Sequence, residues 1–170
     1  MSTAYIALGS NLENPAKQLQ DAVNAMGHWE HSSIEAISKV YSSRAVGPGN
    51  QPDYLNAVVK ITTRLSPSAL LEHLQMQETA QGRIRNEQWG ARTLDLDILL
   101  FDNLQISTQN LEIPHPAMKQ RNFVLYPLAD IVKLDMMLPC GSDLGTLLQQ
   151  SARDDLACSD ISLNYNFKSE

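Results

Sequence analysis

The chain has 170 residues, a net charge of −6 and two cysteines, Cys140 and Cys158. A chain of this length buries roughly two thirds of its unfolded surface, so we expect one domain over residues 1–160 and a tail at 161–170 that need not be ordered. The acidic balance argues against nucleic-acid binding, which needs many Lys or Arg contacts to phosphate, and no apolar run approaches the roughly 20 residues of a membrane helix. Because the cysteines lack metal-like or redox spacing and no secretory leader is recognisable, we expect a reduced, cytoplasmic protein.

The first predicted elements are a strand and a helix. Residues 3–8 form a short apolar run that predicts a buried strand, and the strand is expected to stop at Gly9 and Ser10. Asn14 and Pro15 then supply a helix cap and a first helical residue, and apolar residues recur at helical spacing as far as Gly27, where a helix is expected to end.

Two more strands and a second helix follow. Residues 33–43, SIEAISKVYSS, alternate and predict one strand, which a loop rich in Gly, Pro and Asn separates from a β-branched strand at 54–65. Ser66 and Pro67 then open a helix that Gly82 closes.

The last strand of this series is DLDILLF, which follows a polar, arginine-bearing loop at 83–92. The order βαββαβ predicts an α+β fold, a ferredoxin-like sandwich whose antiparallel sheet has helices on one face. Extra C-terminal elements are expected to be peripheral, with helices from 122 to about 131 and around 144–150.

The DLD triplet carries the clearest chemical signal. Side chains alternate along a strand, so Asp95 and Asp97 point to one face, about 7 Å apart, while Leu94, Leu96 and Ile98 point to the core. Two like charges on an open sheet face are suited to magnesium, which takes one or two carboxylates plus substrate phosphates. For an isolated DxD the plainer alternative is a strand whose outer face happens to be acidic.

Basic residues concentrate around these aspartates. Arg83, Arg85 and Arg92 precede them, and Lys119 and Arg121 follow. Each alone is more simply a surface charge, but arginine grips phosphate oxygens in a planar, bidentate way, and metal plus arginines recurs in phosphoryl transfer. Together they indicate a phosphate site.

Ring-bearing residues near the cluster have two interpretations each. His115, between Pro114 and Pro116, either hydrogen-bonds a phosphate or fixes a turn. Trp89 lies in a polar loop, which favours a lid that stacks on a flat ligand over a core position. Tyr54 and Phe123 are either core or ligand-binding residues.

Three polar residues complete the candidates. Asn56 shares a strand face with Tyr54, and its amide can read the edge of a heterocycle. Gln75 and Glu78 share a helix face, for which solvent exposure is the default expectation.

Four segments resemble a known family. YIALGSNLENP, GNQPDYLNAVV, QWGARTLDLDIL and IPHPAMKQRNFVLYPLADI are similar, in this order, to the 6-hydroxymethyl-7,8-dihydropterin pyrophosphokinases of folate biosynthesis. The resemblance runs from about residue 3 to residue 131, and it implies the ferredoxin-like fold expected from the element order.

The resemblance also implies roles by position. Two magnesium ions would be held by Asp95 and Asp97, ATP and the pterin would be the partners, and the protein would act as a monomer. The implied catalytic residues are Arg83, Arg92 and Asp97. The implied ATP-binding residues are Gln75, Glu78, Arg85, Trp89, Arg92, Ile98, His115 and Arg121. The implied pterin-binding residues are Ser43, Val46, Tyr54, Asn56, Trp89, Asp95 and Phe123.

The chain departs from the family pattern in the loop and after the second proline. Gln88 stands where the family usually has Arg or Lys, Ala91 replaces a proline, Pro116 replaces a frequent tyrosine, and the loop is a residue shorter. Two rival functions stay open at this point, a ligand-sensing module on the same fold and a metal-dependent phosphodiesterase. Formation of AMP from ATP, with and without the pterin alcohol, distinguishes the three.

Overall fold

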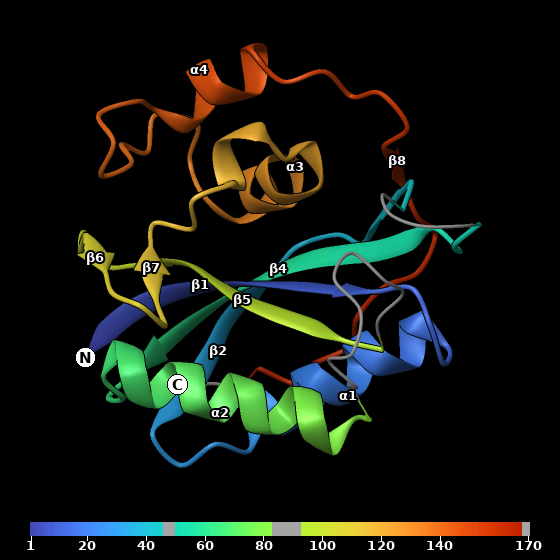
Figure 1. Cartoon of the computed structure of the whole chain (residues 1–170), viewed down its shortest axis with the longest axis horizontal. Coiled ribbons are helices and arrows are strands. Elements are labelled where there is room, and N and C mark those ends of the chain that lie inside the picture. Colours follow the sequence, from blue (N-terminus) through green and yellow to red (C-terminus); the bar gives the residue numbers. More distant parts are fainter. Residues whose placement is uncertain (46–49, 83–92, 168–170) are drawn as a thin grey trace.

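The computed structural model describes residues 1–45, 50–82 and 93–167, and a six-stranded antiparallel sheet lies at its centre (Figure 1). The strands of this sheet are β1 (Ser2–Ser10), β2 (Ser32–Ile37), β3 (Tyr41–Ser43), β4 (Tyr54–Thr63), β5 (Asp95–Phe101) and β8 (Ala157–Cys158). A separate ribbon pairs β6 (Ile106–Ser107) with β7 (Glu112–Ile113). The helices are α1 (Pro15–Gly27), α2 (Pro67–Ala80), α3 (Asn122–Ile131) and α4 (Leu144–Gln149), with a 3₁₀ turn at Met118–Gln120.

The sheet has the strand order β5-β1-β4-β3-β8, with β2 also paired to β4. Both β2 and β3 pair with β4, at successive stretches of it, so they count as one strand of the expected order. The elements from β1 to β5 then follow the order βαββαβ, which confirms the prediction. The predicted caps are also confirmed, since Asn14 accepts a hydrogen bond from the backbone of Lys17 and Ser66 from that of Ala69.

The single strand predicted over residues 33–43 was wrong, because β2 and β3 are separated at Ser38. The Ser38 hydroxyl accepts the backbone N–H of Val58 at 2.8 Å and donates to the carbonyl of Lys39 at 2.7 Å. A side chain that takes over a ladder hydrogen bond in this way replaces the regular backbone pairing. The chain resumes as β3 three residues later, in register with the start of β4.

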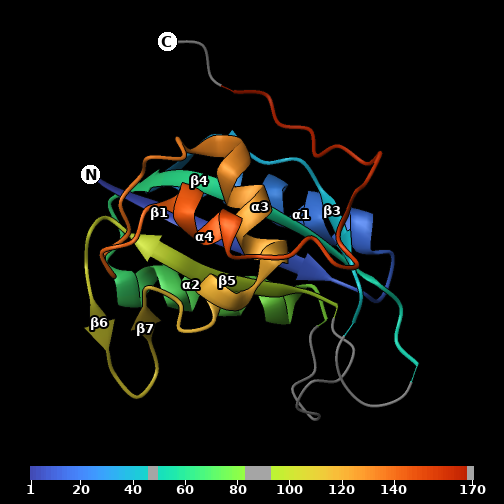
Figure 2. The same ribbon diagram turned by 90° about the horizontal axis from the view of Figure 1, so that it is seen from above.

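Helices cover both faces of the sheet, so the expectation of helices on one face was incomplete (Figures 1 and 2). The first core lies between the sheet and α1 and α2, and includes Leu19, Leu70 and Leu96. A second core joins α3 and α4 to the other face, where Leu125 and Leu144 are fully buried. The C-terminal helices are therefore part of the fold and enclose one end of the face that carries the aspartates.

A bulge in β5 explains which of its residues enter each core. The pairing with β1 shifts between Ile6, opposite Ile98, and Tyr5, opposite Leu100. Leu99 and Leu100 consequently both join the second core, whereas strict alternation would separate them. Before the bulge the alternation holds as predicted, with Leu96 and Ile98 in the first core.

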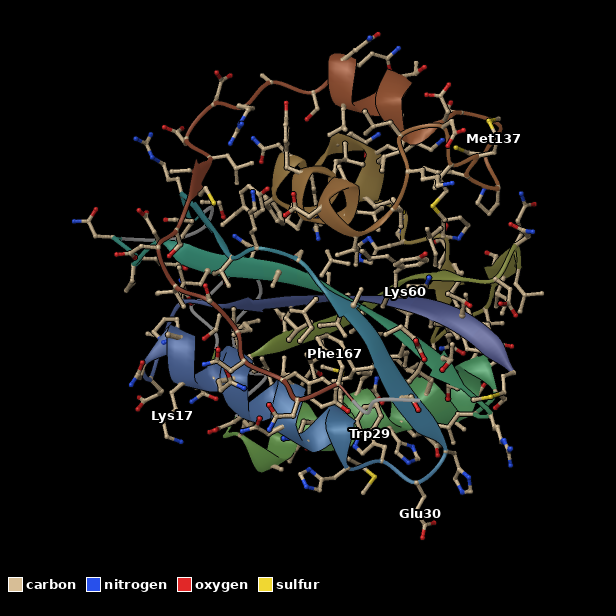
Figure 3. All side chains as sticks on the ribbon, turned by 180° about the vertical axis from the view of Figure 1, so that it is seen from behind. Lys17, Trp29, Glu30, Lys60, Met137 and Phe167 are labelled. Atoms are coloured by element: carbon tan, nitrogen blue, oxygen red, sulfur yellow. The ribbon has the colours of Figure 1, made fainter. Side chains whose placement is uncertain are left out.

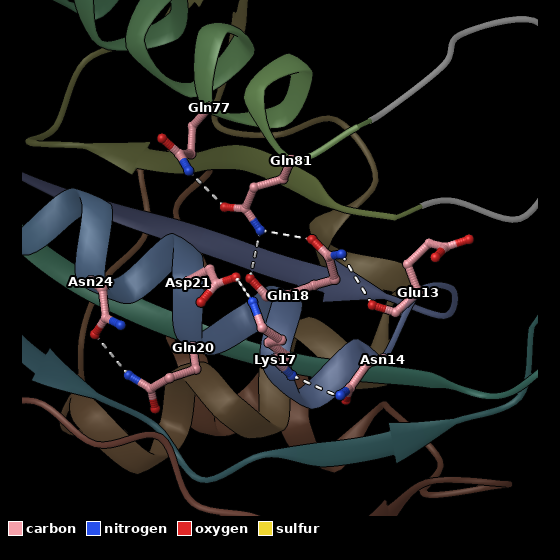
Figure 4. A network of polar contacts seen from close by, with 9 residues as sticks. All are labelled: Glu13, Asn14, Lys17, Gln18, Gln20, Asp21, Asn24, Gln77 and Gln81. Atoms are coloured by element: carbon pink, nitrogen blue, oxygen red, sulfur yellow. Dashed lines mark hydrogen bonds and ion pairs between the residues drawn. The ribbon is translucent and has the colours of Figure 1, made fainter.

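A chain of amide hydrogen bonds joins the end of α2 to the start of α1 (Figure 4). The Gln81 side chain donates to the backbone and side-chain oxygens of Gln18 at 2.9 and 2.8 Å, and it accepts from Gln77 at 2.7 Å. Gln18 in turn donates to the carbonyl of Glu13 at 3.1 Å. These bonds fix the last described turn before residue 83.

The C-terminal segment lies alongside α1 (Figure 3). Gln20 and the backbone of Asn164 exchange two hydrogen bonds of 2.8 Å, and Tyr165 packs so closely on Gly27 that a Cβ there would lie 2.5 Å from the ring. The C-cap of α1 is His28, which has a right-handed conformation, so Gly27 is not needed for capping. It is needed instead for the contact with Tyr165. Among the described residues, no helix is long and apolar enough to span a membrane.

Candidate active site

A pocket of about 800 Å³, including its open mouth, lies where β1, β3, β4 and β5 meet the start of α3. It brings together eight of the residues that the sequence put forward, which are Ser43, Tyr54, Asn56, Asp95, Asp97, His115, Arg121 and Phe123.

The carboxylates face the pocket because of their register on the sheet. Asp95 pairs with Gly9 and Asp97 with Ala7, and residues opposite each other on antiparallel strands project from the same face. Gly9 and Ala7 also line the pocket. A glycine and an alanine of β1 therefore stand beside the two acids and leave room for a ligand.

Asn56 is held rigidly at the base of the pocket. Its side chain is 5% exposed, and its amide nitrogen donates to the Ser43 hydroxyl at 2.8 Å and to the Tyr41 carbonyl at 3.3 Å. With the amide hydrogens committed to these acceptors, the amide oxygen is turned toward Gly9, where an added Cβ would lie 3.6 Å from it. Asn56 thus presents a hydrogen-bond acceptor to the pocket.

His115 both fixes a turn and lines the pocket, so the two roles considered from the sequence are compatible in one residue. The ring Nδ1 of His115 accepts the backbone N–H of Ala117 at 3.1 Å, and the backbone N–H of His115 donates to the carbonyl of Leu99 at 3.0 Å. Burial lowers the pKa of His115, and nearby Arg121 lowers it further, while Asp97 acts in the opposite direction. The neutral ring, with its proton on Nε2, is therefore favoured.

The aromatic and basic residues lie on two walls. Tyr54 stands at the start of β4, and Phe123 stands in the first turn of α3. The Arg121 guanidinium carbon lies 5.6 Å from the centre of the Phe123 ring, within reach of a cation–π contact. The pocket thus has half-buried rings and a cation near the carboxylates.

Three implied ATP-binding residues are not among those lining the pocket. Gln75 is exposed on α2, and Ile98 is 4% exposed in the first core. Glu78 was expected on a solvated helix face, but it is 2% exposed and its carboxylate accepts the backbone N–H of Leu96 at 2.8 Å. That expectation was wrong because α2 packs against β5 at this position.

The remaining candidates, Val46, Arg83, Arg85, Trp89 and Arg92, lie outside the described residues. Conversely, the pocket has lining residues that sequence reasoning missed, among them Arg44, Leu99 and Val124. The sequence could have suggested Arg44 only through its position directly after the candidate residue Ser43. Val124 follows Phe123 in the same way.

Comparisons with known proteins point to one family. A model of the family described as 7,8-dihydro-6-hydroxymethylpterin-pyrophosphokinase (HPPK) matches residues 5–133. The 2-amino-4-hydroxy-6-hydroxymethyldihydropteridine pyrophosphokinase of Haemophilus influenzae is 48% identical over 152 residues, covering 89% of this chain and 94% of that protein. The protein of the same name from Pseudomonas aeruginosa is 46% identical over 144 residues, covering 85% and 88%.

Solved structures show the same fold. Plasmodium falciparum HPPK-DHPS with pteroate superposes with a TM-score of 0.70 at 13% identity, covering 88% of this chain. This chain spans 42% of that longer protein.

Proposed function

Because the chain belongs to the 7,8-dihydro-6-hydroxymethylpterin-pyrophosphokinase family, we propose that it transfers the pyrophosphoryl group of ATP to the hydroxymethyl group of 6-hydroxymethyl-7,8-dihydropterin, releasing AMP, for folate biosynthesis. The observation that carries the proposal is the joint presence in one pocket of Asp95 and Asp97 with the fixed amide of Asn56. The first two suit a metal-bound phosphate and the third suits a heterocycle edge.

The pterin half of the proposal rests on Asn56 and the rings. A pterin carries N–H donors along its amino-pyrimidine edge, and the Asn56 amide oxygen is an acceptor presented to the pocket. Phe123 and Tyr54 would hold the flat ring system between the two walls. Ser43 contributes by holding Asn56 rather than by reading the ligand itself. Val46 and Trp89 are proposed here from the family resemblance.

The phosphate half rests on the chemistry of the donors. Two carboxylates on one face fit magnesium, which keeps several waters and binds phosphate oxygens, and we propose two ions at Asp95 and Asp97. When bound, magnesium neutralises charge on the phosphoryl oxygens. Among the described residues no group of three acidic, His or Cys side chains has the spacing of a closed metal site.

Cations would complete the triphosphate site. Arg121 lines the pocket, and the neutral His115 carries its proton on Nε2, which can donate to a phosphate oxygen. We propose that Arg83, Arg85 and Arg92 also grip the triphosphate, with Arg83 and Arg92 acting on developing charge. The pocket is not lined by Gln75, Glu78 or Ile98, so any contact between these residues and the nucleotide would lie outside it.

The reaction balances in a single displacement. The hydroxymethyl oxygen of the pterin attacks the β-phosphorus of ATP, the bond from that phosphorus to the α,β-bridging oxygen breaks, and AMP leaves with those electrons. The hydroxyl proton is released during the transfer. Asp97 lies in the pocket and is our candidate for placing the attacking group.

The setting of the enzyme is part of the proposal. We propose a cytoplasmic monomer, which has access to ATP, and the free, exposed thiols of Cys140 and Cys158 support a reducing compartment.

The test is to incubate the protein with magnesium, ATP and the pterin alcohol and to measure AMP. We expect one AMP for each pterin consumed, and no AMP when the pterin is omitted. Pterin-independent AMP or ADP would instead indicate hydrolysis, and binding without turnover would indicate a sensing module. Omission of magnesium should abolish the signal.

A further inference from the structure

The pocket has two walls that come from separate parts of the fold. One wall is formed by β3 and β4, with Ser43, Arg44 and Asn56. The other is the start of α3, with Arg121 and Phe123. A flat ring held between two walls needs them at a fixed separation, so the contacts that connect the walls affect ligand binding.

Residues 151–159, here called the C-terminal brace, contact the α3 wall from outside. The Asn122 side-chain amide donates to the carbonyls of Ala152 and Asp154 at 2.9 and 3.3 Å. The Arg153 guanidinium carbon lies 4.9 Å from the centre of the Tyr126 ring. Asn122 immediately precedes the pocket residue Phe123, so these bonds hold the turn that carries the ring.

The same brace contacts the β3 wall. Its strand β8 pairs with β3, placing Ala157 opposite Ser42, and the Ser159 N–H donates to the carbonyl of Val40 at 2.8 Å. The Arg44 guanidinium lies 3.5 Å from the carboxylate of Asp155. β3 has three residues and would be the outer strand of this part of the sheet without β8.

The path of the chain in Figure 1 agrees with these contacts. After α4 the chain passes over α3 and descends to β8, which pairs with β3. Between its two attachments the brace is anchored by Leu156, which is 8% exposed and whose N–H donates to the carbonyl of Arg153 at 3.0 Å. The brace lies beyond residue 133, where the match to the family model ends.

We propose that the C-terminal brace sets the distance between the two walls of the pocket, and that Asn122 and Asp155 are positioning residues for binding of the pterin. This inference rests on the proposed function, because it takes the pterin as the occupant of the pocket. Neither side chain needs to touch the pterin. Asn122 acts through the turn of Phe123, and Asp155 acts through Arg44.

The main variant is Asn122→Asp. It keeps the size of the side chain, removes both N–H donors and places an acceptor against two carbonyls. An acidic residue in the first turn of a helix is favourable, so α3 itself should not be weakened. Asp155→Asn is the second variant, because Asp155 has a φ of 57°, which asparagine tolerates. Asp154→Asn is the matched control, since Asp154 is exposed and forms no ion pair with the described residues.

The measurement is the dissociation constant of 6-hydroxymethyl-7,8-dihydropterin by calorimetry, with magnesium and the inert α,β-methylene analogue of ATP both saturating. Asn122→Asp loses the two hydrogen bonds to the brace, and because loss of a single such bond corresponds to about a threefold to tenfold change, we expect this constant to rise by about that factor or more. Loss of an exposed ion pair predicts about twofold to threefold for Asp155→Asn. We expect no change for Asp154→Asn, and no change in the affinity for the nucleotide analogue measured alone.

The brace hypothesis is overturned if Asn122→Asp binds the pterin as the wild type does, or if its affinities for pterin and nucleotide fall together with its stability to urea. Should Asn122→Asp fail to fold, equal pterin affinities for Asp155→Asn and Asp154→Asn would overturn it. A wild-type protein that neither binds the pterin nor forms AMP contradicts the proposed function instead. The two failures are therefore distinguishable.

Discussion

Glu78 offers a direct test of how the fold supports the aspartates. Its carboxylate is 2% exposed and accepts the N–H of Leu96 at 2.8 Å. Leu96 lies between Asp95 and Asp97 on β5, the outermost strand on its side of the described sheet. Because β5 is an edge strand of the described sheet, Glu78 supplies to this N–H the kind of acceptor that a further strand would provide. We predict that Glu78→Met is destabilised and less active, and that Glu78→Gln is affected less.

The magnitude follows from the hydrogen bond. Methionine fills a similar volume but leaves a buried backbone N–H without an acceptor, which costs about 1–3 kcal/mol. With a slope of about 2 kcal/mol per molar urea, the unfolding midpoint of Glu78→Met should fall by about 0.5–1.5 M. Glutamine keeps an acceptor oxygen and exchanges a charged hydrogen bond for a neutral one, so its loss should be about 1 kcal/mol.

Two assays distinguish a structural role of Glu78 in holding β5 from a role in ligand binding. Urea unfolding followed by far-ultraviolet circular dichroism gives the stability of each variant. AMP formation at increasing magnesium should show that Glu78→Met needs more metal than the wild type, because the strand that carries both carboxylates is no longer fixed. Equal unfolding midpoints for the Met variant and the wild type would refute this reasoning. A weaker affinity for ATP at unchanged stability would instead support the role in ATP binding that the family resemblance implied.

Three further predictions concern the pocket. Asp97→Asn should abolish AMP formation, because it removes a carboxylate from the proposed metal site; a variant with near-normal turnover would exclude Asp97 from that site. Burial lowers the pKa of His115, so the unfolded chain takes up its proton first as the pH falls below about 6.5, and stability falls with pH from there toward the lower folded pKa. His115→Gln should therefore lose less stability than the wild type between pH 7.5 and 5.5, measured as urea midpoints. Phe123→Ala should raise the dissociation constant of the pterin about twofold to tenfold through loss of ring stacking, while the affinity for the nucleotide alone, measured by calorimetry, stays the same.

The parts of the fold that local sequence determines were predictable. Asn14 and Ser66 cap helices as expected because capping involves residues three apart. The face of Asp95 and Asp97 followed from the two-residue period of a strand. The break at Ser38 and the bulge near Leu99 did not follow, because both depend on how one strand pairs with another.

The residues of the site also divide into those that the local sequence could reveal and those that it could not. Asp97 and Asn56 could be proposed because each carries its chemistry in its own side chain. Glu78 could not be placed correctly, since its burial depends on an N–H of β5, eighteen residues away. Asn122 gave no signal at all, because its partners are two backbone carbonyls some thirty residues further along the chain. Long-range backbone partners leave no periodic trace in a sequence.

Gly9 shows how one residue type supports two opposite interpretations. In an apolar run a glycine commonly marks the end of a strand, and on that basis the first strand was expected to stop there. The structure instead continues β1 through Ser10, with Gly9 paired to Asn56 on one side and to Asp95 on the other. A Cβ at Gly9 would meet Asn56 at 3.6 Å and Tyr54 at 3.8 Å, which are ordinary contact distances that the fold would tolerate. The space is therefore of use to a ligand rather than to packing, and the glycine belongs to the pocket rather than to a turn.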